Sequence, residues 1–112
     1  MDKCIFCMIV DGKIPSEKLF EDENMIIIKD ISPQAPVHLL MIMKEHYENV
    51  GDMSEKQAVA LGKSIKKFAD FAKDSGIECF RIISNCGVDA CQSVAHIHIH
   101  LLAGKQLNGR MG

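Results

Sequence analysis

The chain has 112 residues, of which 47% are hydrophobic, and its 13 basic and 15 acidic side chains give a formal net charge of -2. This length predicts a single domain over residues 1–112, and the balanced charge argues against nucleic acid as a partner. No run approaches the roughly 20 apolar residues that a membrane span needs, and no apolar signal region opens the chain. Five cysteines, an odd number, favour reduced thiols or a metal site over disulfides. We therefore expect a cytoplasmic protein with no membrane partner.

The first half of the chain predicts a short helix and three strands. An apolar segment at 6–10 is followed by Gly12, which suits the end of a short N-terminal helix. Strands are expected at 18–23, 25–30 and 37–44. A hairpin turn at Glu23 and Asn24 joins the first two, because asparagine tolerates the left-handed geometry of tight turns.

The second half predicts a long helix and two strands. Ser54 and Gln57 have the spacing of a capping box, and apolar residues then recur every three or four positions as far as Ala72. This pattern predicts one long helix over 54–75, with its lysines on a solvated face. Strands at 79–85 and 94–102 are separated by a loop at 86–92. The whole is predicted to be an α+β domain with a mostly antiparallel five-stranded sheet, one long helix and a short N-terminal helix.

The last predicted strand carries histidine at every second position, at His96, His98 and His100, with aliphatic residues between them. Successive strand side chains point to opposite faces, so one face is predicted to be imidazole and the other aliphatic. Imidazoles roughly 6 to 7 Å apart could attack a phosphorus or carbonyl centre, contact its oxygens or bind a metal. The alternative is the solvated polar face of an amphipathic strand.

Several further residues carry two interpretations each. The two-residue spacing of Cys4 and Cys7 is compatible with half of a tetrahedral zinc site, or with two packed free thiols. His38 is a functional histidine or a core residue of its apolar strand. Asp30 either contacts a ligand or starts the Ser-Pro turn that follows it, and Asn85 either contacts a ligand or is a turn residue.

Two blocks together, DISPQAPVH at 30–38 and QSVAHIHIH at 92–100, resemble the histidine triad (HIT) family and specifically its Hint branch of purine nucleotide hydrolases. The resemblance covers residues 4–107 and implies a HIT-like fold. It also implies a homodimer, with the helix at 54–75 and the strand at 79–84 near the two-fold axis.

The resemblance implies a role for each catalytic position. His98 would attack the α-phosphorus of a nucleotide and form a nucleotidyl-histidine intermediate, with no metal needed for catalysis. His100 would donate to the phosphate oxygens, and Ser93 would assist protonation of the departing amine. His38 would orient the nucleophile or relay its proton.

The resemblance also implies a nucleotide site and a metal site. The carboxylate of Asp30 would accept both ribose hydroxyls. The other nucleotide contacts would be Ile31, Phe6 and Ile9 at the base, Asn85 at the ribose and phosphate, and Cys91, Gln92 and Ser93 at the phosphate side with His98 and His100. A structural zinc would be bound by Cys4, Cys7, His46 and His96.

Two departures from the family pattern stand out. Cys91 occupies a position where the family usually has glycine, which narrows the space on the phosphate side. The tail at 107–112 lacks the tryptophan and prolines found in many Hint proteins. The implied function is hydrolysis of purine nucleoside phosphoramidates or aminoacyl-adenylates at the α-phosphorus. The alternatives are a dinucleoside polyphosphate hydrolase and a nucleotide-binding regulatory protein with incidental turnover.

Overall fold

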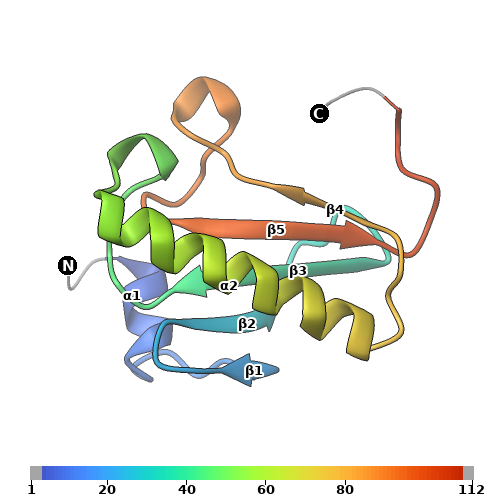
Figure 1. The fold of residues 1–112 in the computed structure, drawn as a ribbon, viewed down its shortest axis with the longest axis horizontal. Helices are drawn as coiled ribbons and strands as arrows, with labels where there is room; N and C mark the ends of the chain where they lie inside the picture. Colours follow the sequence, from blue (N-terminus) through green and yellow to red (C-terminus); the bar gives the residue numbers. More distant parts are fainter. Residues whose placement is uncertain (1–3, 110–112) are drawn as a thin grey trace.

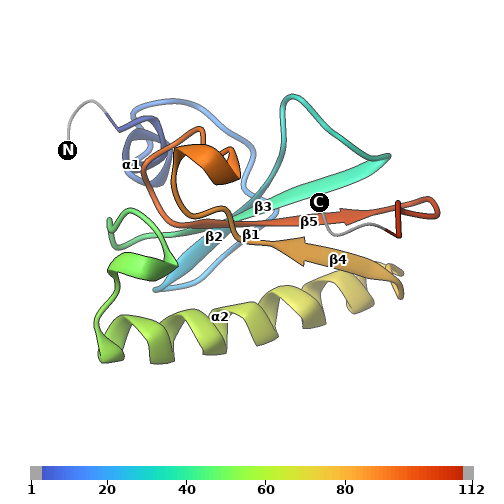
Figure 2. The same ribbon diagram turned by 90° about the horizontal axis from the view of Figure 1, so that it is seen from above.

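A computed structural model describes residues 4–109 of the chain, which form a five-stranded antiparallel sheet with one helix on each face (Figures 1 and 2). The strand order is β1-β2-β3-β5-β4, which confirms the predicted fold class. The elements are α1 (Ile5–Val10), β1 (Phe20–Glu21), β2 (Met25–Lys29), β3 (Val37–Met43), η1 (Val50–Asp52), α2 (Glu55–Asp74), β4 (Phe80–Ile83), η2 (Val88–Ala90) and β5 (His98–Ala103).

The long helix α2 begins at the predicted capping box. The Gln57 amide N–H donates to Ser54 Oγ at 3.1 Å, and the Ser54 N–H donates to Gln57 Oε1 at 2.8 Å. The helix buries one stripe, including Leu61 and Phe68, against the sheet. Its exposed lysines confirm the predicted solvated face.

The opposite face of the sheet is covered by α1 (Figure 2). Phe6 and Ile9 of this helix are buried against alternate residues of the two central strands, Ile26, Ile28, Leu40 and Ile42. The even-numbered residues of β2 and β3 therefore pack on α1, and the odd-numbered ones pack on α2. Among the described residues no helix is long and apolar enough to cross a membrane.

The last strand is shorter than predicted. It begins at His98 rather than at 94, because the preceding backbone makes other hydrogen bonds. The His96 N–H donates to the Val94 carbonyl, and the Ile97 N–H donates to the Tyr47 carbonyl. His96 therefore lies outside the regular pairing with β3 that includes His98 and His100.

Other differences are confined to strand ends and one loop. The predicted strands at 18–23 and 79–85 shorten to β1 and β4, and the predicted loop at 86–92 contains the short turn η2. The hairpin turn after β1 is confirmed. Asp22 Oδ1 accepts the N–H groups of Asn24 and Met25, and this side-chain turn ends the strand early.

Candidate functional site

His98 and His100 lie on the α1 face of β5, whereas Ile99 and Leu101 pack on the α2 face. The predicted division into imidazole and aliphatic faces is confirmed for this strand. The interpretation as a solvated polar face is wrong, because only 5% of His98 is exposed. The rings of His98 and His100 have centroids 5.0 Å apart, closer than the strand spacing predicted.

The hydrogen bonding of His98 defines its tautomer. Its Nδ1 lies 2.7 Å from the carbonyl oxygen of His96, so Nδ1 carries the proton and donates it. The lone pair is therefore on Nε2. Burial lowers the pKa of His98 below its ordinary value, although the backbone hydrogen bond acts in the opposite direction. The lowered pKa keeps the ring neutral near pH 7. His98 thus presents an unprotonated nitrogen with nucleophilic character.

His38 defines the tautomer of its neighbour in turn. The Gln34 N–H donates to His38 Nδ1 at 2.9 Å, so the proton of His38 is on Nε2. That nitrogen lies 2.9 Å from His100 Nδ1 and donates to it. His100 therefore carries its own proton on Nε2. Burial, with smaller contributions from His98 and His38, lowers the pKa of His100 to about 4, so it is a neutral donor.

This geometry refines what the sequence indicated for His38. The side chain is buried, as the core interpretation required, but both of its nitrogens are hydrogen-bonded within the site. Its hydrogen-bonded side-chain partner is His100, so His38 contacts the triad through His100. His38 is placed by register, since it pairs with Leu102 two residues along β5 from His100.

Asp30 forms the predicted turn with one carboxylate oxygen and approaches the histidine group with the other. Oδ1 accepts the Ser32 N–H at 2.7 Å and forms the turn. Oδ2 lies 3.4 Å from His38 Nε2, at the edge of the histidine group. The adjacent Ile31 is 97% exposed, whereas the other two residues predicted at the base, Phe6 and Ile9, are buried between α1 and the sheet.

A cavity of about 410 Å³ opens beside His100. Its lining brings together three predicted residues besides His100, namely His38, Asn85 and Cys91, with Gln34, Arg81, Ile83, Ala90 and Leu102. Arg81 was not predicted. It reaches the cavity because β4 pairs with β5 so that Ile83 lies opposite His100. The signal in the sequence was a single cation within an otherwise apolar strand.

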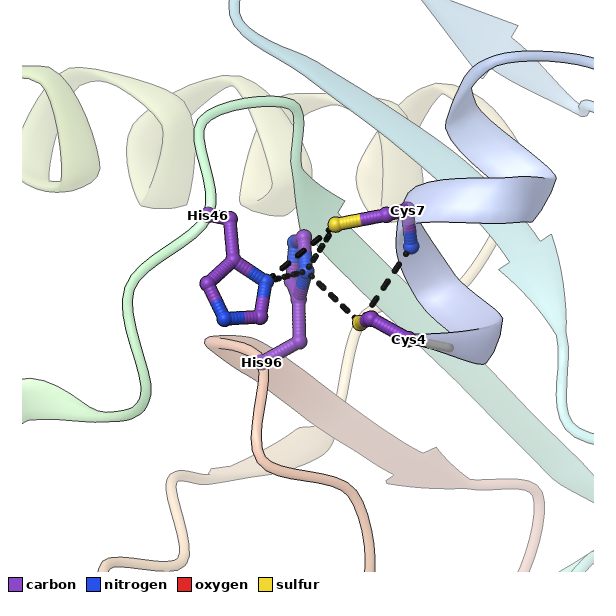
Figure 3. A group of neighbouring side chains, drawn as sticks. All are labelled: Cys4, Cys7, His46 and His96. Atoms are coloured by element: carbon purple, nitrogen blue, oxygen red, sulfur yellow. Dashed lines mark hydrogen bonds between the residues drawn. The ribbon is translucent and has the colours of Figure 1, made fainter. Parts of the chain in front are cut away.

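A second group of side chains lies at the start of β5, where Cys4, Cys7, His46 and His96 point toward one another (Figure 3). His96 Nδ1 is 3.5 Å from each cysteine sulfur and 3.0 Å from His46 Nδ1, and Cys7 Sγ is 3.2 Å from His46 Nδ1. Tetrahedral zinc with two sulfur and two nitrogen ligands places its donor atoms about 3.3 to 3.8 Å apart. The four atoms therefore nearly form the tetrahedron that zinc requires.

The protonation of His96 also suits a metal ligand. Its Nε2 lies 2.6 Å from the Met43 carbonyl oxygen and donates to it, which leaves the lone pair on Nδ1 at the centre of the group. Burial and the neighbouring Cys4 raise the pKa of the Cys7 thiol to about 11, so a cation would have to displace this proton. Four protein donors leave no position for a reacting water, as in structural zinc sites.

Asp30, His38 and His100 also form a close group of potential ligands, but their chemistry differs. The nitrogen of His38 that faces the other two is Nε2, which carries a proton because Gln34 holds Nδ1. A protonated nitrogen has no lone pair for a cation. The group near the cysteines therefore fits a metal, and this one fits proton donation.

Comparison with known proteins shows the family of the chain. A family model described as scavenger mRNA decapping enzyme C-term binding matches residues 3–112. Relatives with HIT-like names include a Chlamydia muridarum protein that is 48% identical over 89% of this chain and 80% of its own length. The chain belongs to the histidine triad family.

Among other HIT proteins, the chain is 39% identical to the "14 kDa zinc-binding protein" of Zea mays, over 93% of this chain and 84% of the maize protein. The solved structure of a HIT family hydrolase from Clostridium thermocellum has a TM-score of 0.93 and 43% identity, and covers 99% of this chain and 98% of that one.

In this HIT protein the loop before β5 has an unusual backbone. Cys91 has a φ of 65°, the one left-handed residue other than glycine in the described chain. A side chain in this conformation costs roughly 1 to 2 kcal/mol, which explains why glycine suits the position. The Cys91 and Ser93 side chains are exposed, and Gln92 between them is partly buried.

Proposed function

We propose that this HIT protein hydrolyses purine nucleoside phosphoramidates, including aminoacyl-adenylate-type substrates, at the α-phosphorus. The observation that carries the proposal is the hydrogen bonding of two adjacent rings, which assigns them opposite tautomers. His98 has its lone pair on Nε2, and His100 has its proton on Nε2. One ring is thus suited to attack phosphorus, and its neighbour is suited to donate to a phosphate oxygen.

The reaction proceeds in two displacements. His98 Nε2 forms a bond to phosphorus as the phosphorus–nitrogen bond breaks, and the electron pair leaves with the amine. The amine takes the proton of the Ser93 hydroxyl, and exposed Ser93 takes a proton from solvent in return. The ring of His98 becomes positively charged, and the carbonyl of His96 that accepts its Nδ1 proton stabilises this charge. Water then attacks phosphorus, the bond to Nε2 breaks, and the nucleoside monophosphate leaves with His98 regenerated.

The nucleotide contacts extend from this pair. Asp30 accepts the ribose hydroxyls, exposed Ile31 covers the base with Phe6 and Ile9 beneath, and Asn85 contacts the ribose and phosphate. Cys91, which lines the cavity, is on the phosphate side of the nucleotide in this proposal. In support, the relative "Adenylylsulfatase HINT1" of Arabidopsis thaliana is 40% identical over 93% of this chain and 73% of its own length, and its name indicates action on an adenylyl group.

We propose that Cys4, Cys7, His46 and His96 bind one structural zinc ion. Zinc in this position would join the N-terminus of α1 to the segments after β3 and before β5, and it would supply folding energy rather than chemistry.

We further propose that the protein is a homodimer. β4 is an edge strand of the sheet, and 42% of its Ile82 is exposed. A second copy would cover this edge, which is otherwise open to association. Light scattering at micromolar concentration should give the mass of two chains, and a monomeric mass would contradict the proposal.

The test of the proposed function is direct detection of the intermediate. An adenosine phosphoramidate reaction quenched in alkali within the first turnovers, and digested for mass spectrometry, should carry an adenylyl group on the peptide with His98. Dinucleoside polyphosphates run in parallel test the rival substrate class. Turnover without any adduct on His98 would contradict the covalent mechanism.

A further inference from the structure

The side chain of Gln92 makes four hydrogen bonds within the protein. Its Oε1 accepts from Asn49 Nδ2 at 3.1 Å and from the Gly87 N–H at 2.8 Å. Its Nε2 donates to the Glu48 carbonyl at 2.6 Å and to the Val94 carbonyl at 3.0 Å. An amide side chain has two donor hydrogens and two acceptor lone pairs, so no polar group of Gln92 remains for a phosphate.

These bonds surround the residue proposed to protonate the leaving group. Gln92 contacts Gly87 through both its side chain and its backbone N–H, which donates to the Gly87 carbonyl. It also reaches the Val94 carbonyl, so the backbone is fixed on both sides of Ser93. The same loop contains the left-handed Cys91, a strained conformation that persists only where surrounding contacts hold it.

The other ends of the bonds lie outside the cavity. Glu48 and Asn49 follow His46 in the segment between β3 and α2, and neither lines the cavity beside His100. Tyr47 of this segment also accepts the Ile97 N–H just before β5. The loop at 87–94 is therefore attached to a separate segment of the fold, in which Tyr47 is buried.

We propose that Gln92 is a positioning residue that acts through Ser93 and makes no side-chain contact with the nucleotide. Its amide fixes the loop so that the Ser93 hydroxyl meets the departing nitrogen. This inference rests on the proposed function and goes beyond it, because it predicts that Gln92 matters only where the leaving group needs a proton. It also replaces the role at the phosphate that the family resemblance implied for the Gln92 side chain.

Two substitutions test the inference from opposite ends of the bonds. Gln92→Glu keeps the size of the side chain but removes both donors to Glu48 and Val94. Asn49→Asp keeps the oxygen that accepts the Gly51 N–H, but it removes the donor to Gln92 and places a negative charge against Oε1. Gln106→Glu, at an exposed position, is the control for an amide-to-acid change.

Two adenosine 5'-phosphate derivatives separate positioning from general damage. An alkylamine phosphoramidate needs a proton on its leaving group, whereas a p-nitrophenyl ester does not. Gln92→Glu and Asn49→Asp should each lose about 10- to 100-fold in kcat on the amine substrate, as expected for a misplaced catalytic group. Their KM should stay within about threefold of the wild-type value. On the ester, kcat should fall by less than about threefold. The double variant should be no worse than the worse single one.

Equal losses on both substrates would show a merely structural role, and a rise in KM with kcat preserved would show direct nucleotide binding. Either result overturns the inference. Hydrogen exchange of the Cys91 amide, which donates to the Val88 carbonyl within the same loop, supplies a readout without substrate, and it should accelerate in both variants but not in Gln106→Glu. Unchanged exchange would overturn the inference, whereas a wild-type protein inactive on the phosphoramidate with accelerated exchange in the variants would overturn the proposed function alone.

Discussion

His96 and His98 are two residues apart, yet the regions around them hold the same side chain in opposite states. His96 donates from Nε2 to the Met43 carbonyl and turns the Nδ1 lone pair toward two cysteines. His98 donates from Nδ1 to the His96 carbonyl and leaves Nε2 free. The position of one accepting carbonyl thus separates a residue suited to a metal from one suited to nucleophilic attack. The chemistry of each histidine therefore follows from the backbone carbonyl to which its ring donates.

The largest expected effect comes from removing the free Nε2. His98→Asn should abolish phosphoramidate hydrolysis, because the nucleophile is lost, while AMP binding stays within about tenfold, or ~1.4 kcal/mol. Turnover assays and titration calorimetry on the same preparation measure the two quantities. Substantial turnover by this variant would remove the functional distinction between the two regions.

The metal region should respond in the opposite way. The purified protein should contain about one zinc ion per chain, and Cys4→Ser should lose it together with about 10 °C in Tm, corresponding to ~2 kcal/mol for a chain of this size. Activity per folded molecule should change less than in His98→Asn. Elemental analysis and thermal melting measure this, and Cys86→Ser, at an exposed cysteine outside the group, is the control. A zinc-free protein with unchanged Tm would show that Cys4 and Cys7 are packed free thiols and not metal ligands.

A smaller effect is expected at His38, which sets the tautomer of His100. His38→Leu should lower kcat about tenfold, because His100 is then free to place its proton on either nitrogen. His38→Gln can still donate to His100 Nδ1 and should restore part of the rate. Steady-state kinetics of both variants measure the difference, and equal rates would show that the hydrogen bond at 2.9 Å does not control His100.

The smallest expected effect is a dependence of stability on pH. The pKa of His100 is about 4 in the folded chain and 6.5 as a free side chain, so the unfolded chain binds more protons between these values. The free energy of unfolding is therefore highest above pH 6.5, as far as His100 determines it, and it decreases as pH falls toward 4. Urea unfolding at several pH values should show this slope, and His100→Gln should reduce it. A slope identical in both proteins would contradict the shifted pKa.

The fold was largely predictable because its signals are local. The alternation of histidine with aliphatic residues predicts two faces for β5, and the spacing of Ser54 and Gln57 predicts the start of α2. The start of β5 was not predictable, because the Ile97 N–H bonds to Tyr47, fifty residues earlier in the chain. Arg81 likewise reaches the cavity only through the pairing of β4 with β5.

The sequence supplies the reacting residue types: the pair Cys4 and Cys7, five histidines and the amide of Gln92, at spacings typical of a HIT protein. The tertiary structure alone decided which nitrogen of each histidine carries the proton and whether Gln92 faces a ligand or the protein. The physical reason is that a hydrogen bond depends on a partner brought close by folding. Met43 lies 53 residues from His96, and Glu48 lies 44 residues from Gln92, beyond the reach of any local pattern.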